Sequence, residues 1–237
     1  MKDKVVQDFD ESEGTGVWTC EEDTNLHTPI PTILVAHTFR IASADSDRRE
    51  RNFDAAGRAI SEPKKVEAKD LKAFLEDLRL AVYGAFLASF VQGLKLLAKA
   101  GHINHWNLDF AKIIGIWRGG CIIRSEFISE FLLEVYQKAD DATTGDLLSS
   151  SKVEAEFKKV YHPLKNALVI SIEANAVVPT LAASLEYIKY STRNKDLPTV
   201  FVEAELDYFG HHNFDLKNGS GKPKTGTVTG TILFEYR

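Results

Sequence analysis

Apolar residues recur at steps of three and four positions along residues 66–100, and this periodicity limits the possible folds more than any other feature. It is typical of a long helix, and the apolar positions are Leu71, Phe74, Leu75, Leu78, Val82, Phe86, Leu87, Phe90, Leu94 and Leu97. Residues 81–91 carry no charge, so this part of the helix is predicted to be buried on every side. Gly101 is predicted to end the helix. The rest of the chain must therefore supply helices that surround this one.

The same periodicity, together with proline and glycine positions, predicts helices along most of the remaining sequence. They cover residues 33–41 after Pro29 and Pro31, an exposed charged segment 42–58, and residues 107–117, 122–138, 153–175, 178–193 and 198–210, with a linker at 57–65. Residues 218–224 are rich in Gly, Ser, Pro and Lys, and residues 225–236 are β-prone, which predicts an extended tail. The predicted fold class is all-α, with a helical domain over residues 1–217 and a tail over residues 218–237.

Composition excludes several classes of partner. The net charge of −5 lacks the excess of Lys and Arg that neutralises nucleic acid phosphates. The first ten residues are charged, and no uninterrupted apolar stretch is expected to span a bilayer, so neither a signal peptide nor a membrane segment is predicted. Cys20 and Cys121 lie far apart and are expected to be reduced thiols. These features predict a cytoplasmic protein that binds neither nucleic acid nor membrane.

Three blocks occur in a fixed order along the chain: GTGVWT at residues 14–19, WRGGCIIRS at 117–125 and DYFGHH at 207–212. Together they closely resemble the C-terminal domain of 6-phosphogluconate dehydrogenase. The resemblance implies an all-α domain that forms a homodimer, with the C-terminal tails exchanged between subunits. It also implies that Arg118 and Arg124 of the second block are mainly structural.

The resemblance further implies that the family's nicotinamide-binding domain, catalytic lysine and acid carboxylate would precede the first block. Within the chain no GxGxxG motif follows a strand pattern. We therefore expect no cofactor and no oxidation with NADP. His102 and His105 lack a third ligand at helical spacing, so no metal site is expected either.

Four positions match polar residues that face the substrate in this family, and two of them have changed. The family's lysine in the GTGxWT block is Val17 here, and its arginine before DYFG is Leu206. Arg40 and His212 match a phosphate-binding arginine and a histidine and are kept. The lost cations would each have made charge-assisted hydrogen bonds of roughly 1.5–3 kcal/mol, so 6-phosphogluconate is not expected to bind.

The neighbouring residues Trp18, Tyr208 and His211 are the other substrate-binding candidates. The two aromatic residues are interpreted either as core or as pocket walls. His211 and His212 are the titratable candidates, because neutral imidazole can move a proton near pH 7, although a surface or interface role is an alternative. Arg40 is predicted to bind a carbonyl or carboxylate, or else to be an ordinary charge at a helix C-terminus.

Two functions remain open from the sequence, and whether the chain is an enzyme is itself undecided. One is a cofactor-independent enzyme of specialised (secondary) metabolism that acts on a largely apolar small molecule by isomerisation, elimination or cyclisation, including a pericyclic step. The other is a non-catalytic dimerisation or binding partner of a full-length 6-phosphogluconate dehydrogenase. A simple truncation of an active dehydrogenase is disfavoured, because truncation does not explain Val17 and Leu206.

Overall fold

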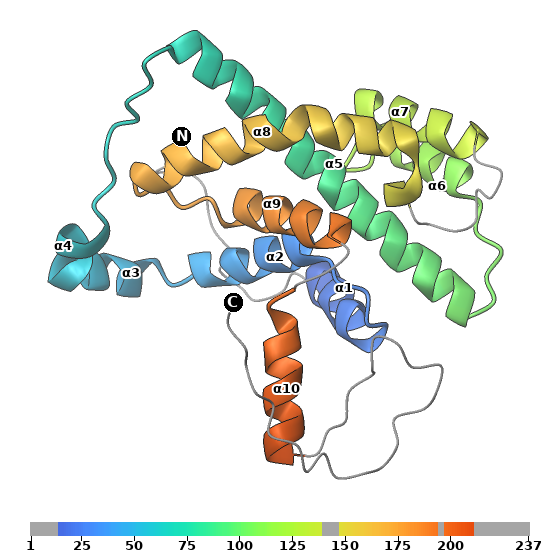
Figure 1. The fold of residues 1–237 in the computed structure, drawn as a ribbon, viewed down its shortest axis with the longest axis horizontal. Helices are drawn as coiled ribbons and strands as arrows, with labels where there is room; N and C mark the ends of the chain where they lie inside the picture. Colours follow the sequence, from blue (N-terminus) through green and yellow to red (C-terminus); the bar gives the residue numbers. More distant parts are fainter. Residues whose placement is uncertain (1–13, 139–146, 194–196, 211–237) are drawn as a thin grey trace, which may run out of the picture. The chain divides into compact units, whose positions relative to one another are not determined.

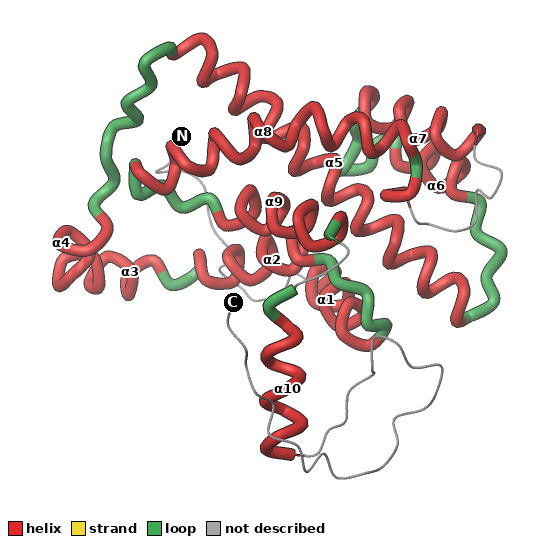
Figure 2. The backbone as a smooth tube through the Cα atoms, in the orientation of Figure 1, coloured by secondary structure: helices red, strands yellow, loops and turns green. Residues whose placement is uncertain are grey.

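The computed structural model describes residues 14–138, 147–193 and 197–210, and every regular element in these ranges is a helix (Figures 1 and 2). The predicted all-α fold is therefore confirmed for the described residues. The chain divides into a large unit that ends at Thr192 and a second unit that begins at Arg193. The predicted tail, residues 218–237, lies outside the described residues.

The core of the large unit forms around α5, Leu71–Ile103, which crosses α8, Ser151–Glu173, and packs on α9, Pro179–Thr192 (Figure 1). Leu87 and Leu94 of α5 have no exposed surface, so the predicted apolar positions do build the core. Among the described helices, α5 is the one that is long and apolar enough to cross a membrane by length and composition, which by itself is weak evidence for a membrane segment. Half of that apolar window is buried inside the protein, which is typical of a core helix.

The first of two wrong predictions about α5 concerns the burial of residues 81–91. Val82 and Phe86 are 40% and 58% exposed, so residues 81–91 are not buried on every side. Gly84, two residues from each and thus on the opposite face, packs so closely on Val160 of α8 that a Cβ would lie 2.7 Å from its Cγ2. An uncharged segment of this helix is therefore buried on one face and exposed on the other.

The end of α5 also differs from the prediction. The helix continues through Gly101 to Ile103, and Asn104 is its C-cap. Gly101 is buried, and a Cβ there would lie 2.7 Å from Cδ1 of Leu108. The glycine is therefore needed for the close approach of the following loop, and not for ending the helix.

Two shorter helices pack near the C-terminal half of α5. Asp109 caps α6, Phe110–Trp117, by accepting a 3.0 Å hydrogen bond from the Lys112 amide. The ring of Trp117 meets Phe90 of α5 edge-on at 6.0 Å. The next helix, α7, covers Glu126–Lys138 and packs on α6, and a short 3-10 turn follows at Leu147–Ser149.

The N-terminal part of the large unit contributes two helices that pack together, α1, Gly14–Asn25, and α2, Pro31–Ser43. The helix α2 begins at a proline, as predicted, and packs on α9 and α5. The helix α1 was not predicted, because its two glycines and weakly amphipathic sequence give little helical signal.

A helical arm follows α2 and leads back to α5 (Figure 2). It contains α3, Ser46–Asn52, a π-helical turn at Phe53–Gly57, and α4, Arg58–Ser61. The predicted linker at 57–65 is therefore displaced, and the non-helical segment is 62–70. Asn175 Nδ2 donates to the Glu62 carbonyl at 2.9 Å, which ties this segment to the end of α8.

The second unit contains one described helix, α10, Thr199–Gly210. It begins directly after Pro198, as predicted from the sequence. Leu206 and Tyr208 lie on this helix.

Candidate functional site

The candidate site begins where α1 meets α2. A Cβ on Gly16 of α1 would lie 2.6 Å from Nδ1 of His37 on α2, so the His37 ring would have to shift if residue 16 carried a side chain. Gly16 directly precedes Val17, and His37 lies one helical turn before Arg40. This contact therefore brings the helix of Val17 and Trp18 next to the helix of Arg40.

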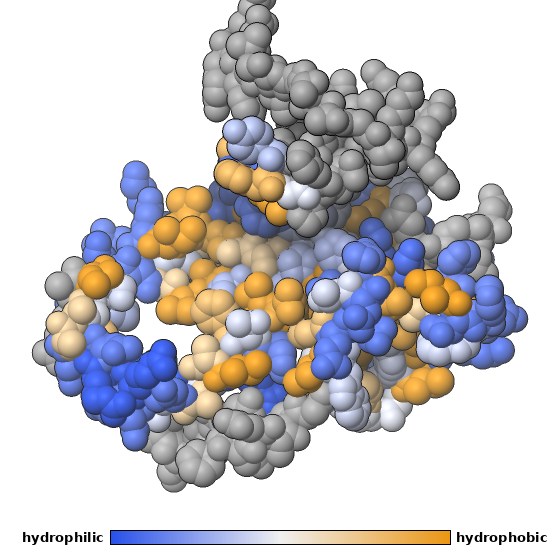
Figure 3. Space-filling view, turned by 90° about the horizontal axis from the view of Figure 1, so that it is seen from below, coloured by the Kyte–Doolittle hydropathy of each residue, from blue (hydrophilic) through white to orange (hydrophobic). Residues whose placement is uncertain are grey.

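The two helices that meet at this contact carry exposed apolar side chains. Val17 and Trp18 are 41% and 64% exposed, so the interpretation of Trp18 as a core residue is wrong for the described chain. On α2, Phe39 and Ile41, which flank Arg40, are 48% and 53% exposed. Hydrophobic side chains gather in several groups among hydrophilic ones on the face that Figure 3 shows.

Arg40 lies in the last turn of α2, where the helix dipole favours a positive charge. The Ser43 hydroxyl donates to the Arg40 carbonyl at 2.6 Å, so the backbone here is held within the helix end. The Arg40 side chain is exposed to solvent. An exposed guanidinium at a helix end can bind a carboxylate or carbonyl oxygen.

The remaining predicted site residues belong to the second unit or lie outside the described residues. Leu206 and Tyr208 of α10 are 44% and 79% exposed, so neither belongs to a core. The ring of Tyr208 packs edge-on against Phe209 at 5.1 Å. His211 and His212 lie outside the described residues. The sequence predicts that these residues share one site with Arg40, and this stays a prediction for Leu206, Tyr208, His211 and His212.

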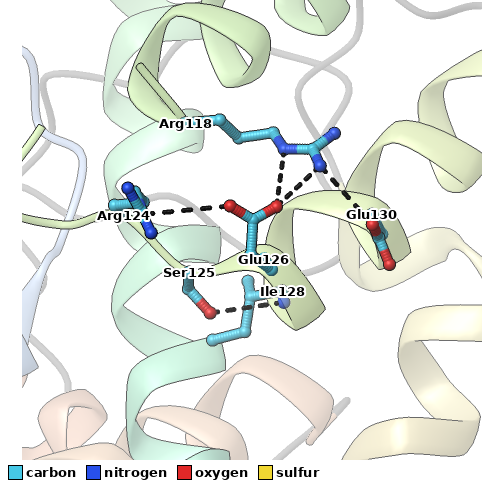
Figure 4. Close-up of polar contacts among 6 residues, drawn as sticks. All are labelled: Arg118, Arg124, Ser125, Glu126, Ile128 and Glu130. Atoms are coloured by element: carbon cyan, nitrogen blue, oxygen red, sulfur yellow. Dashed lines mark hydrogen bonds and ion pairs between the residues drawn. The ribbon is translucent and has the colours of Figure 1, made fainter. Parts of the chain in front are cut away.

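The WRGGCIIRS block forms the turn between α6 and α7 (Figure 4). Gly120 adopts a φ of 93°, which an L side chain rarely adopts. Arg118 Nη2 lies 2.6 Å from Glu126 Oε2 and 3.4 Å from Glu130 Oε1, and Arg124 Nε lies 3.8 Å from Glu126 Oε1. Both arginines thus have carboxylate partners on α7, in partly exposed ion pairs. The packing role that the resemblance implies for this block stays a prediction.

Some residues that position the site were not found from the sequence. His37 has a recognisable signal only in retrospect, because it lies one turn before the arginine and faces a glycine of the first block. The buried polar residues Thr32, Gln92 and Ser184 are far apart in sequence, and nothing local marks them. Among the described residues no group of three His, Cys, Asp or Glu side chains is placed to hold a metal ion.

Comparisons with known proteins identify the family. The family model described as "6-phosphogluconate dehydrogenase, C-terminal domain" matches residues 1–227. The decarboxylating 6-phosphogluconate dehydrogenase of Emericella nidulans is 39% identical over 99% of this chain and 47% of its own length. That of Synechococcus elongatus is 31% identical over 92% of this chain and 45% of its own length.

A solved structure supports the same family assignment. The 6-phosphogluconate dehydrogenase of Plasmodium falciparum superimposes with a TM-score of 0.79, at 28% identity, over 93% of this chain and 46% of that chain. The chain thus spans about half the length of the relatives it matches. It belongs to the 6-phosphogluconate dehydrogenase family and corresponds to the C-terminal domain of its members.

Proposed function

We propose that this chain forms a homodimer and binds a largely apolar small molecule, whose carbonyl or carboxylate contacts Arg40. The observation that carries the proposal is the α1–α2 contact at Gly16 and His37, which sets α1, the helix that carries Val17 and Trp18, beside α2, the helix that carries Arg40. Leu206 and His212 of the partner subunit would complete the site, and the exchanged tails would hold it together. A cytoplasmic location accompanies this proposal.

The substituted cations support an apolar ligand over a sugar phosphate. With Val17 and Leu206, two aliphatic side chains occupy positions where the family has Lys and Arg. A phosphate placed beside them would lose its hydration without gaining hydrogen bonds, which is costly. Arg40 alone leaves one cation, which suits a single carboxylate or a polarised carbonyl.

The chemistry open to such a site needs no cofactor. Arg40 can stabilise negative charge that develops on a carbonyl oxygen, and His212 can accept or donate a proton. These two groups suffice for an isomerisation, an elimination or a cyclisation of a bound substrate. In a pericyclic reaction the enzyme would act mainly by holding the substrate in a reactive shape, and His212 would matter little.

The relatives are decarboxylating dehydrogenases, and that activity is the reference against which the proposal is tested. Isothermal titration calorimetry would use benzoate as a probe with one carboxylate on an apolar ring. We expect benzoate to bind and Arg40→Ala to weaken it about tenfold, the loss of one charge-assisted hydrogen bond. Equal benzoate binding by the wild type and by Arg40→Ala would overturn the proposal, as would micromolar binding of 6-phosphogluconate or NADP.

A second candidate function is assembly with a full-length 6-phosphogluconate dehydrogenase. It is favoured by the exposed apolar side chains on α1 and α2, which are Val17, Trp18, Leu34, Phe39 and Ile41. Light scattering at micromolar concentration distinguishes the two candidates. A homodimer that dissociates when residues after Asn218 are deleted supports self-association, whereas a monomer that dimerises only with an added dehydrogenase supports the alternative.

A further inference from the structure

The first turn of α2 does not cap itself. Its N-cap residue is Ile30, whose side chain cannot accept a hydrogen bond. Ile30 is fully buried and Thr32 is 4% exposed, so water cannot replace the missing cap. Pro31 has no amide hydrogen, and the Ile33 amide donates to the Ile30 carbonyl at 3.0 Å. The Ile30 and Thr32 amides therefore need acceptors from elsewhere in the protein.

Gln92, sixty residues away in the middle of α5, supplies one of these acceptors. Its Oε1 accepts from the Thr32 amide at 2.9 Å, and its Nε2 donates to Thr32 Oγ1 at 2.8 Å. The Gln92 side chain has no exposed surface. Both bonds form only in this amide orientation, because the reverse one would set two donors against each other at the Thr32 amide.

The bonds continue from α2 to α9. Ser184 Oγ donates to the Thr180 carbonyl at 2.8 Å, which uses its hydrogen. The Thr32 hydroxyl therefore donates to Ser184 Oγ, at 3.1 Å. The buried hydroxyls of Thr32 and Ser184 and both ends of the Gln92 amide thus take part in hydrogen bonds that join α5, α2 and α9.

The same helix end is tied to α1. Asp23 Oδ1, near the end of α1, accepts from the Ile30 amide at 3.1 Å. Side chains from α1 and α5 thus take the place of a local cap on α2. The opposite end of α2 carries Arg40, which lies eight residues after Thr32, or about 12 Å along a rigid helix.

We propose that Gln92 is a positioning residue for the Arg40 site, which acts through Thr32 by fixing the start of α2. It touches no ligand, but a shift or rotation of α2 at Thr32 moves Arg40 relative to Val17 and Trp18. This inference rests on the proposed function for the role of Arg40. The capping role of Gln92 itself rests only on the hydrogen bonds among Thr32, Gln92 and Ser184.

The test replaces Gln92 by Met, which has a similar length and removes both hydrogen bonds. Thr32→Val removes the hydroxyl and is paired with Thr32→Ser, which keeps it. Val160→Ala, in the α5–α8 contact away from α2, is the control for general destabilisation. Each variant is measured by amide hydrogen exchange along α2 and α8 and by calorimetric titration with benzoate.

We expect Gln92→Met to speed exchange in α2 roughly tenfold relative to α8, and to weaken benzoate binding about fivefold. Thr32→Val should act in the same direction, and Thr32→Ser should stay near the wild type. Val160→Ala should not speed exchange selectively in α2. Equal exchange changes in α2 and α8 for Gln92→Met, or benzoate affinity unchanged by a selective loosening of α2, would overturn the inference.

The two proposals fail in different ways. If benzoate does not bind to the wild-type protein, the proposed ligand of Arg40 is wrong, and the positioning of a ligand site by Gln92 is wrong with it. The exchange measurement then still decides whether Gln92 caps α2. If benzoate binds through Arg40 but Gln92→Met has no effect on it, the proposed function stands and the positioning role is rejected.

Discussion

The α5–α8–α9 core and the exposed surface of α1 and α2, called the α1–α2 face below, both carry many apolar side chains. The two regions differ in how far these side chains are exposed. In the core, residues such as Leu94 and Leu164 have no exposed surface. On the α1–α2 face, Trp18 and Phe39 are 64% and 48% exposed. Apolar residues in the core are explained by stability, whereas those on the α1–α2 face stabilise the folded chain little. Their exposure is the basis of the proposal that they contact a ligand or another subunit.

The largest expected effect is in the core. Leu94→Ala should lower the free energy of unfolding by about 2–5 kcal/mol, because it removes buried methyl groups and leaves a cavity. Urea unfolding followed by circular dichroism measures this loss. A change below about 1 kcal/mol would mean that this part of α5 is packed no better than the exposed face.

A smaller effect is expected at the edge of the core. Tyr83 donates to Glu156 Oε2 at 2.9 Å, which joins α5 to α8. Burial, and then the hydrogen bond to Glu156, raise the pKa of the Tyr83 phenol. The pair is partly open to solvent, so Tyr83→Phe should cost only about 1 kcal/mol near neutral pH.

The raised pKa of Tyr83 also predicts the sign of a pH dependence. The stabilisation by the neutral phenol is complete below about pH 10, the unfolded pKa, and is lost as the pH rises through the higher folded pKa. Urea unfolding at increasing alkaline pH should therefore show a shallower loss of stability for Tyr83→Phe than for the wild type. Identical pH profiles would contradict the role of this phenol.

The ion pairs at the turn between α6 and α7 should matter still less. Arg118 bonds Glu126 and Glu130, but the carboxylates are mostly exposed. Arg118→Met should therefore change the free energy of unfolding by less than about 1 kcal/mol. Thermal unfolding at low and high salt checks this, and a large loss that salt does not reduce would show a different role for the arginine.

The smallest effect on stability is expected at the α1–α2 face. Trp18→Ala should change the free energy of unfolding by no more than about 0.5 kcal/mol, because the side chain is largely exposed. It should nevertheless weaken benzoate binding severalfold, since an aromatic wall is lost. Ile172→Ala, at an exposed position of α8, is the matched control and should alter neither quantity. Equal effects of the two variants on binding would remove the distinction between the faces.

The sequence predicts most of the helices because their starts are fixed locally. Prolines precede or begin α2, α9 and α10, and the apolar period locates α5 and α8. What it fails to predict depends on contacts between distant residues. Gly101, inside α5, leaves room for Leu108 of the following loop, and Val82 is 40% exposed although its segment is uncharged.

The candidate site divides in the same way. The sequence predicts Val17 and Arg40 as site candidates because they match positions in the family motifs. His37 and Gln92 position the same helices, but their roles depend on Gly16 and Thr32, which only the fold brings near. A local pattern identifies residue types, whereas a buried polar network is set by tertiary packing.

The central claim is that Val17 and Leu206 have changed the ligand of this family's substrate site. Calorimetric titration of the Val17→Lys, Leu206→Arg double variant tests it most directly, with 6-phosphogluconate and benzoate as ligands. The account predicts that the wild type binds benzoate and not 6-phosphogluconate, and that the double variant gains affinity for 6-phosphogluconate while losing it for benzoate. A wild type that binds 6-phosphogluconate at micromolar concentration, or a double variant that gains nothing, would contradict it.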